Sequence, residues 1–94
     1  MSKESIRASI DAKKAEIARV RTSIAQLRSR KSETSARYSA NIKNAKEAGT
    51  KARLRSEKAS VIAHIEESIR SEQGRIASLQ RAIVSLREQL KYAK

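Results

Sequence analysis

Residues 62–90 decide the fold, and their sequence is IAHIEESIRSEQGRIASLQRAIVSLREQL. Large aliphatic residues recur in this stretch at alternating steps of three and four, interrupted by one acidic residue. The resulting seam consists of Ile62, Ile65, Ile69, Glu72, Ile76, Leu79, Ile83, Leu86 and Leu90. Because such steps keep side chains on one narrow stripe of a helix, the pattern predicts a coiled-coil helix.

A second seam runs through the N-terminal part of the chain. Its members occupy the a and d positions of a heptad, and they are Ile6, Ile10, Ile17, Val20, Ile24 and Leu27. Between the two seams, over residues 28–58, the only large apolar residues are Tyr38, Ile42 and Leu54. The sequence therefore predicts two helices separated by a stretch with a weak pattern.

The position of Gly49 near the chain midpoint predicts a reversal of direction. Glycine commonly ends a helix because it adopts positive φ without a Cβ clash, and Thr50 could cap the helix that follows. We therefore expect an all-α antiparallel hairpin, one domain over residues 1–94, with helices over about residues 3–48 and 51–92. The alternative is one long helix that dimerises, with Gly49 tolerated at a cost of about 1 kcal/mol.

The polar seam positions suggest a register for the hairpin. With Ile17 opposite Leu86, Lys31 would face Glu72, and the two charges would neutralise each other. A pair of this kind specifies register more than it adds stability. Because two helices alone bury little surface, we expect self-association into a dimer, or the helices of a protein partner, to complete a bundle. The residues predicted to form this association seam are Ile10, Ile17, Val20, Ile24, Leu27, Ile62, Ile65, Ile69, Ile76, Leu79, Ile83, Leu86 and Leu90.

The composition excludes several classes of site. The chain has no Cys, no Pro, two Gly and one His, which rules out a disulfide framework and makes a many-stranded β fold improbable. His64 falls on a solvent-facing position of the second helix. No side chains have the spacing of a nucleophile and its base, a metal site or a phosphate-binding loop. We therefore predict a protein that is not an enzyme and that holds no cofactor and no metal.

The charge balance predicts electrostatic contacts with a partner. The chain has 22 basic and 10 acidic residues, a net charge of +12, and ten of the basic residues lie within residues 28–58. The e positions of the first helix are all basic, whereas the corresponding positions of the second helix offer one acid, Glu66. An acidic helix or phosphate groups could meet this charge. The residues predicted to make such contacts are Arg7, Lys14, Arg21, Arg28, Arg30, Lys31, Arg53 and Arg55.

No run of apolar residues in the sequence is long enough to span a bilayer. A bilayer span needs roughly 18 apolar residues, and the first 14 residues lack the apolar region of a cleaved signal peptide. The narrow apolar stripes without Trp or Phe suit a partner helix better than a membrane surface. We expect a cytoplasmic protein, with export independent of a signal peptide left open.

In length, central turn and two long heptad stretches, the chain resembles the small helical-hairpin proteins of bacterial type VII secretion, the WXG100-like and LXG-toxin-associated families including the YwqH-like group. The stretches are SIDAKKAEIARVRTSIAQLRSRKSE (residues 9–33) and IEESIRSEQGRIASLQRAIVSLREQL (residues 65–90). The central turn, EAGTKAR, lacks Trp-x-Gly, and Tyr92 begins no Tyr-x-x-x-Asp/Glu signal, so no functional residue is carried over. The resemblance implies an adaptor or chaperone that binds the helical targeting domain of a secreted toxin.

An alternative function is nonspecific binding of nucleic acid through residues 28–58. Six to ten phosphate contacts would give strong, salt-sensitive affinity without sequence readout. A basic-zipper arrangement is excluded, because Gly49 interrupts the recognition helix and Ala52 stands where that family has Arg. The scarcity of aromatic residues argues against stacking on single strands.

Overall fold

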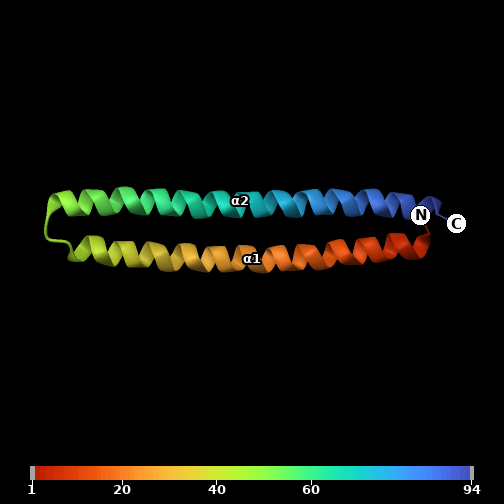
Figure 1. The fold of residues 1–94 in the computed structure, drawn as a ribbon, viewed down its shortest axis with the longest axis horizontal. Coiled ribbons are helices and arrows are strands. Elements are labelled where there is room, and N and C mark those ends of the chain that lie inside the picture. The colour runs from red at the N-terminus through yellow and green to blue at the C-terminus, as the bar shows by residue number, and fades with distance from the viewer. Residues whose placement is uncertain (1, 94) are drawn as a thin grey trace. The chain divides into compact units, whose positions relative to one another are not determined.

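The computed structural model describes residues 2–93, and these form two helices joined by a short connection (Figure 1). Helix α1 spans Lys3–Asn44 and helix α2 spans Ala48–Tyr92. The two helices pack as an antiparallel hairpin, and residues 2–93 contain no strand. The predicted all-α helical hairpin is therefore confirmed.

Helix α1 begins at a serine cap. The Ser2 hydroxyl accepts a hydrogen bond from the Ser5 amide at 3.1 Å, and the Ser2 carbonyl accepts one from the Ile6 amide at 3.0 Å. These bonds satisfy amides that the first helical turn leaves without partners. Glu4 in the first turn adds a negative charge at the positive end of the helix dipole.

The connection lies at residues 45–47, before Gly49 rather than at it. Helix α1 ends at Asn44, earlier than the predicted end near Ala48, and Gly49 lies in the first turn of α2. The Glu47 carbonyl accepts a hydrogen bond from the Lys51 amide at 3.1 Å, so Glu47 is the residue that caps α2 and the predicted cap at Thr50 is wrong.

The backbone of Gly49 explains why the predicted role fails. Neither glycine has a positive φ, so Gly49 does not adopt the left-handed conformation that ends helices. Ala48 and Lys51 are strong helix formers, and they extend α2 over the glycine at a cost of about 1 kcal/mol. The Glu47 carboxylate at the N-terminus of α2 further favours this early start.

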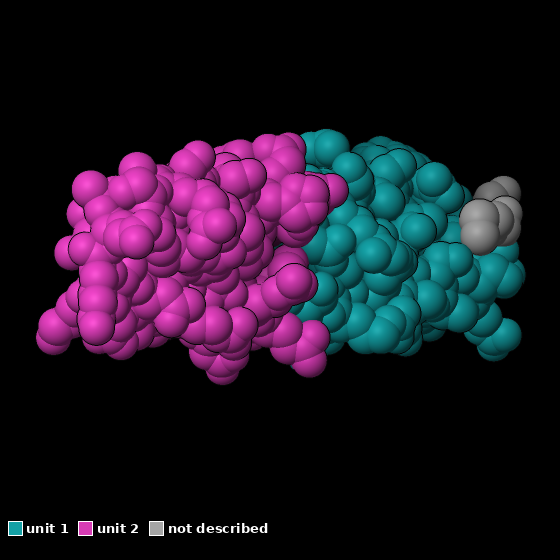
Figure 2. Space-filling view, turned by 60° about the vertical axis from the view of Figure 1, so that its left-hand side comes forward, with its two compact units in different colours: residues 1–24, 72–94 teal, residues 25–71 magenta. Residues whose placement is uncertain are grey.

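Contacts divide the chain into two compact units, which Figure 2 shows in different colours. Unit 1 comprises residues 1–24 and 72–94, and unit 2 comprises residues 25–71. In unit 1, a buried cluster joins the two helices, and partly buried residues of α2 pack against it. The buried cluster is Ile6, Ile10, Ile17 and Ile83, and its partly buried neighbours are Ile76, Leu79, Leu86, Leu90 and Ala93.

Unit 2 has a more polar interior. Only Ile65 and Ile69 are buried there, and half-buried positions include Lys31, Thr34 and Tyr38. These residues occupy the a and d positions that continue the first seam. The same side of α1 therefore faces α2, but large apolar residues are scarce on that side in unit 2. Unit 2 therefore gains less from apolar burial than unit 1.

The register of unit 2 follows from two contacts between its helical segments. The Lys31 ammonium lies 3.3 Å from the Glu66 carboxylate, and the Lys58 ammonium donates a hydrogen bond to the Ser39 hydroxyl at 3.0 Å. Eight residues forward along α1 thus correspond to eight residues back along α2, as antiparallel helices require.

This register corrects the predicted pairing of Lys31 with Glu72. Lys31 pairs with Glu66, whereas Glu72 belongs to unit 1 and lines a shallow groove with Glu16, Arg19 and other residues of that unit. The prediction rested on opposing the two charged seam positions, but an acid at the flanking e position also reaches a seam cation. Glu66 does so, and the helices pair six residues earlier along α2 than predicted.

Candidate interaction surfaces

The predicted association seam is inaccessible or half-accessible along its whole length. Its buried members are Ile10, Ile17, Val20, Ile24, Ile65, Ile69 and Ile83. Its half-buried members are Leu27, Ile62, Ile76, Leu79, Leu86 and Leu90. None is fully exposed, because each lies on the side of its helix that faces the other helix of the hairpin.

Burial along the seam is uneven between the two helices. In α1, four of the five seam residues predicted to associate are buried, and only Leu27 is half-buried. In α2, five of the eight are half-buried. Helix α2 therefore keeps the larger share of the apolar surface that a further helix could cover.

The two flanks of unit 1 differ in charge pairing. On one flank, the Arg75 guanidinium donates to the Glu16 carboxylate and joins α2 to α1. On the opposite side of the α1 seam lie Arg7, Lys14 and Arg21, and all three are exposed. None of them forms an ion pair with a described residue, so their charge is available to a partner.

The remaining predicted contact residues lie in unit 2. Lys31 is half-buried and paired, while the other predicted residues, Arg28, Arg30, Arg53 and Arg55, are exposed. The side chains of Arg28, Lys31 and Glu66 line an open groove of about 760 Å³, which we call the Lys31 groove. It also contains Arg70, so three cations face one acid in it.

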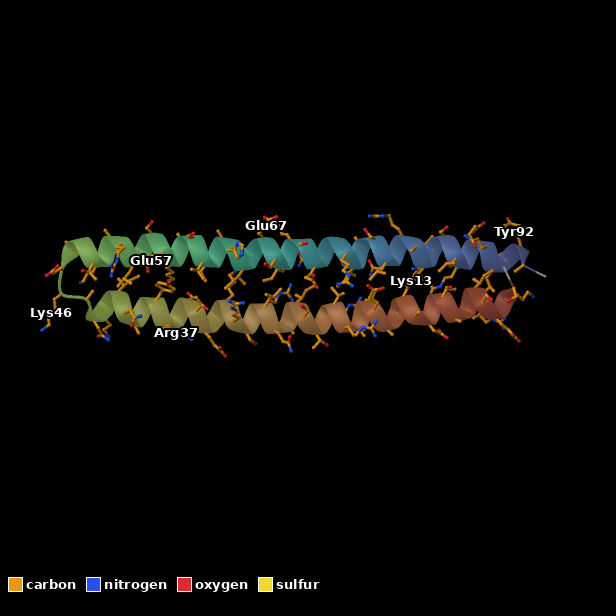
Figure 3. The ribbon with its side chains drawn as sticks, viewed as in Figure 1. Lys13, Arg37, Lys46, Glu57, Glu67 and Tyr92 are labelled. Atoms are coloured by element: carbon orange, nitrogen blue, oxygen red, sulfur yellow. The ribbon has the colours of Figure 1, made fainter. Side chains whose placement is uncertain are left out.

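A short ion pair within α2 borders this groove. The Arg70 guanidinium donates to the Glu67 carboxylate at 2.7 Å, one helical turn away. This hydrogen bond, together with the charge of Glu67, raises the pKa of Arg70. Figure 3 shows Glu67 projecting away from α1, so the pair lies on the outer side of the helix.

The turn end of unit 2 carries a concentration of exposed cations. Arg53 forms an ion pair with Glu57 at 3.7 Å. Lys46 lies on the connection itself and projects away from both helices (Figure 3). The exposed basic residues of this turn-end cluster are Arg37, Lys43, Lys46, Arg53 and Arg55.

Two features were not anticipated from the sequence. Glu66 pairs with Lys31, although its e position beside the seam is a signal that could have suggested this partner. Val84 and Tyr92 are 65% and 77% exposed, and among the described residues they are the large hydrophobic side chains most accessible to solvent. Because Val84 follows the buried Ile83, it falls just outside the seam, where heptad analysis gives it no role.

Residues 2–93 show no grouping of acidic and histidine side chains able to hold a metal ion. His64 is exposed and lines a second open groove of unit 2, together with Leu27 and Arg30. None of the described helical segments is long and apolar enough to cross a membrane. No protein-family model matches the chain, and no curated protein or solved structure shows significant similarity to it.

Proposed function

We propose that this protein is a non-catalytic adaptor whose hairpin packs against the helices of a partner protein. The observation that carries the proposal is the half-exposed seam of α2. In unit 1, Ile76, Leu79, Leu86 and Leu90 pack on the buried cluster and still keep exposed surface. A third helix laid against α2 would remove this surface from water, with a gain of about 25 cal/mol for each Å² of apolar area.

The resemblance to type VII secretion hairpins supports a more specific version of this proposal. The partner would be the helical targeting domain of a secreted toxin, and the hairpin would act as its chaperone or co-secreted partner. Without that partner, a second copy of the chain would cover the same seam and form a dimer.

The test has two measurements. Light scattering over a range of protein concentrations gives the oligomeric state of the chain alone. Co-expression with the helical targeting domain of a secreted toxin encoded beside the gene then shows whether a complex of defined stoichiometry co-purifies. We expect a concentration-dependent dimer alone and a hetero-complex in the presence of the toxin domain.

A matched pair of variants makes this test specific. Leu86→Ser removes half-buried apolar surface from α2. Arg81→Ser is the control, because it introduces serine at an exposed position of the same helix. We expect Leu86→Ser to lose the complex while far-UV circular dichroism still shows helix, and Arg81→Ser to retain it. A chain that stays monomeric at every concentration and binds no toxin domain would contradict the adaptor function.

A second function, nonspecific binding of nucleic acid, is supported by the turn-end cluster. The cations of this cluster are exposed, and Arg53 is the one that pairs with a described acid. Such a cluster can contact phosphates without reading base sequence. A retardation assay with duplex DNA and duplex RNA at rising salt tests this function, and absence of a shift at low salt would exclude it.

A further inference from the structure

One flank of unit 1 combines cations and uncovered apolar surface without an acid between the helices. The Glu16–Arg75 ion pair occupies one side of the seam. The e positions of both helices lie on the other side, because e and g positions flank a heptad seam. We call this side the e flank, and its residues are Arg7, Lys14 and Arg21 of α1 and Gln73, Gln80 and Arg87 of α2.

All six residues of the e flank are exposed, and four of them are cations. None of the four forms an ion pair with a residue that the structure describes. Asp11 lies near Arg7 and Lys14 along the outer side of α1, but it forms no ion pair with either of them. The charge of this flank is therefore not neutralised by the hairpin itself.

The α2 side of the e flank has one cation, Arg87, and is otherwise uncharged and partly apolar next to the α1 cations. Val84 stands four residues after Gln80 and three before Arg87, so it shares their face of the helix. It is 65% exposed, and Ala77, one heptad earlier, is half-buried. The e flank thus offers an apolar strip on α2 beside a row of positive charge on α1.

The spacing of the row indicates which acidic partner fits it. Successive cations on α1 are seven residues apart, which is about 10.5 Å along a helix axis. A partner helix with acids at heptad positions repeats at the same distance. One strand of DNA, in contrast, presents a phosphate about every 3.4 Å, so most phosphates would meet no cation of the row.

We propose that the e flank of unit 1 binds an acidic amphipathic helix of another protein, with carboxylates along the α1 row and an apolar face on Val84 and Ala77. The proposal rests on the adaptor function and names the chemistry of its partner. A second copy of the chain does not fit, because pairing identical e flanks would place cation against cation.

The experiment uses the full chain and synthetic helical peptides of about three heptads. One peptide has Leu at positions a and d and Glu at e and g, a second has Gln at e and g, and a third has Lys there. Binding is measured by fluorescence anisotropy at low and high salt. We expect the Glu peptide to bind tightest, with an affinity that falls as salt rises, and the Lys peptide to show no binding.

Two charge-matched triple variants locate the site. The first is Arg7→Gln, Lys14→Gln and Arg21→Gln, and the control is Lys3→Gln, Arg19→Gln and Arg81→Gln, all at exposed positions. We expect the first triple variant to weaken the affinity for the Glu peptide about ten-fold, and the control triple to weaken it less than two-fold. Val84→Asp should weaken it as well, whereas both triples should keep the helicity of the parent chain because Gln is a good helix former.

The possible results separate this proposal from the adaptor function. Equal binding of the Glu and Gln peptides, unaffected by the first triple, would overturn the acidic partner and leave helix binding in place. Equal weakening by both triples would overturn the e flank as the site. Tighter binding of duplex DNA than of the Glu peptide, lost in the first triple, would overturn the protein partner in favour of phosphate. Failure of all peptides would overturn the proposal, and the co-purification experiment decides the adaptor function independently.

Discussion

Unit 1 and unit 2 carry the same charge and differ in what they bury. Each contains 11 basic and five acidic residues. Unit 1 nevertheless buries six aliphatic side chains, whereas unit 2 buries two. The difference shows that packing in this hairpin follows the identity of the a and d residues rather than the charge around them.

The same contrast separates two kinds of surface. In unit 1, six buried aliphatic residues hold the two helical segments together, and the exposed flanks lie beside them. In unit 2, polar residues such as Lys31 and Thr34 occupy inner positions, and the Lys31 groove remains open beside them. Few buried apolar contacts are typical of segments that open locally more often than the rest of a protein.

The largest expected effect comes from deleting apolar volume in unit 1. Ile17→Ala removes a side chain that is 6% exposed, and we expect the free energy of unfolding to fall by about 2–5 kcal/mol. Ile42→Ala in unit 2 removes the same atoms from a half-buried position and should cost about half as much or less. Urea unfolding followed by circular dichroism measures both, and equal losses would remove the distinction between the units.

A smaller gain is expected from adding apolar volume to unit 2. Thr34→Leu places an aliphatic side chain at a half-buried inner position, and we expect the free energy of unfolding to rise by about 1 kcal/mol. Hydrogen exchange should slow mainly in residues 25–71. Thr22→Leu, at an exposed position of α1, is the control and should change neither quantity appreciably. Destabilisation by Thr34→Leu would show that the polar interior of unit 2 is already well packed.

Substitution of the two glycines, one in each unit, is expected to change the free energy of unfolding by a similar amount. A Cβ added at Gly49 or at Gly74 would meet no atom within 4 Å, and neither glycine has a positive φ. Gly74→Ala in unit 1 and Gly49→Ala in unit 2 should therefore each raise the free energy of unfolding by about 0.5–1 kcal/mol. Thermal unfolding measures both changes. A loss of stability in Gly49→Ala alone would return the chain reversal to Gly49.

The smallest expected effect concerns the ion pairs. Lys31 and Glu66 are each 41% exposed, so solvent screens their attraction. A double-mutant cycle with Lys31→Gln and Glu66→Gln should give a coupling of about 0.2–1 kcal/mol that shrinks at high salt. The matching cycle of Lys31 with Glu72 should give none. Coupling in the second cycle instead of the first would restore the register predicted from sequence.

The sequence predicted the helices and the reversal of the chain, but not the place of the reversal. Heptad spacing identified the seams because burial in a helix repeats with that period. The position of the connection depends on a small energy difference. Gly49 can end a helix or continue one at a cost of about 1 kcal/mol, and its strong helix-forming neighbours decide the outcome. The register error has a separate cause: Lys31 was assigned to Glu72 because both are charged seam positions, whereas Glu66 at the flanking e position reaches it.

The candidate surfaces were only partly predictable for a related reason. Exposed Arg and Lys residues at e positions follow from the pattern, since such positions lie beside the seam in any coiled coil. The exposure of Val84 also follows, because residue 84 is a b position that faces away from the seam, but a lone aliphatic residue there carries no periodic signal of a binding role. Which flank holds the Glu16–Arg75 ion pair also depends on the register of two distant segments.

The sequence by itself determined the two helices, the faces they turn toward each other and the uneven supply of apolar residues along them. These properties are local, because they depend on residues within a few turns of one helix. The tertiary structure alone decided the register and, through it, which cations are paired within the hairpin and which stay free. Those outcomes depend on which segments of the two helices lie opposite each other. A heptad pattern looks the same after a shift of seven residues, so the local pattern does not fix that alignment.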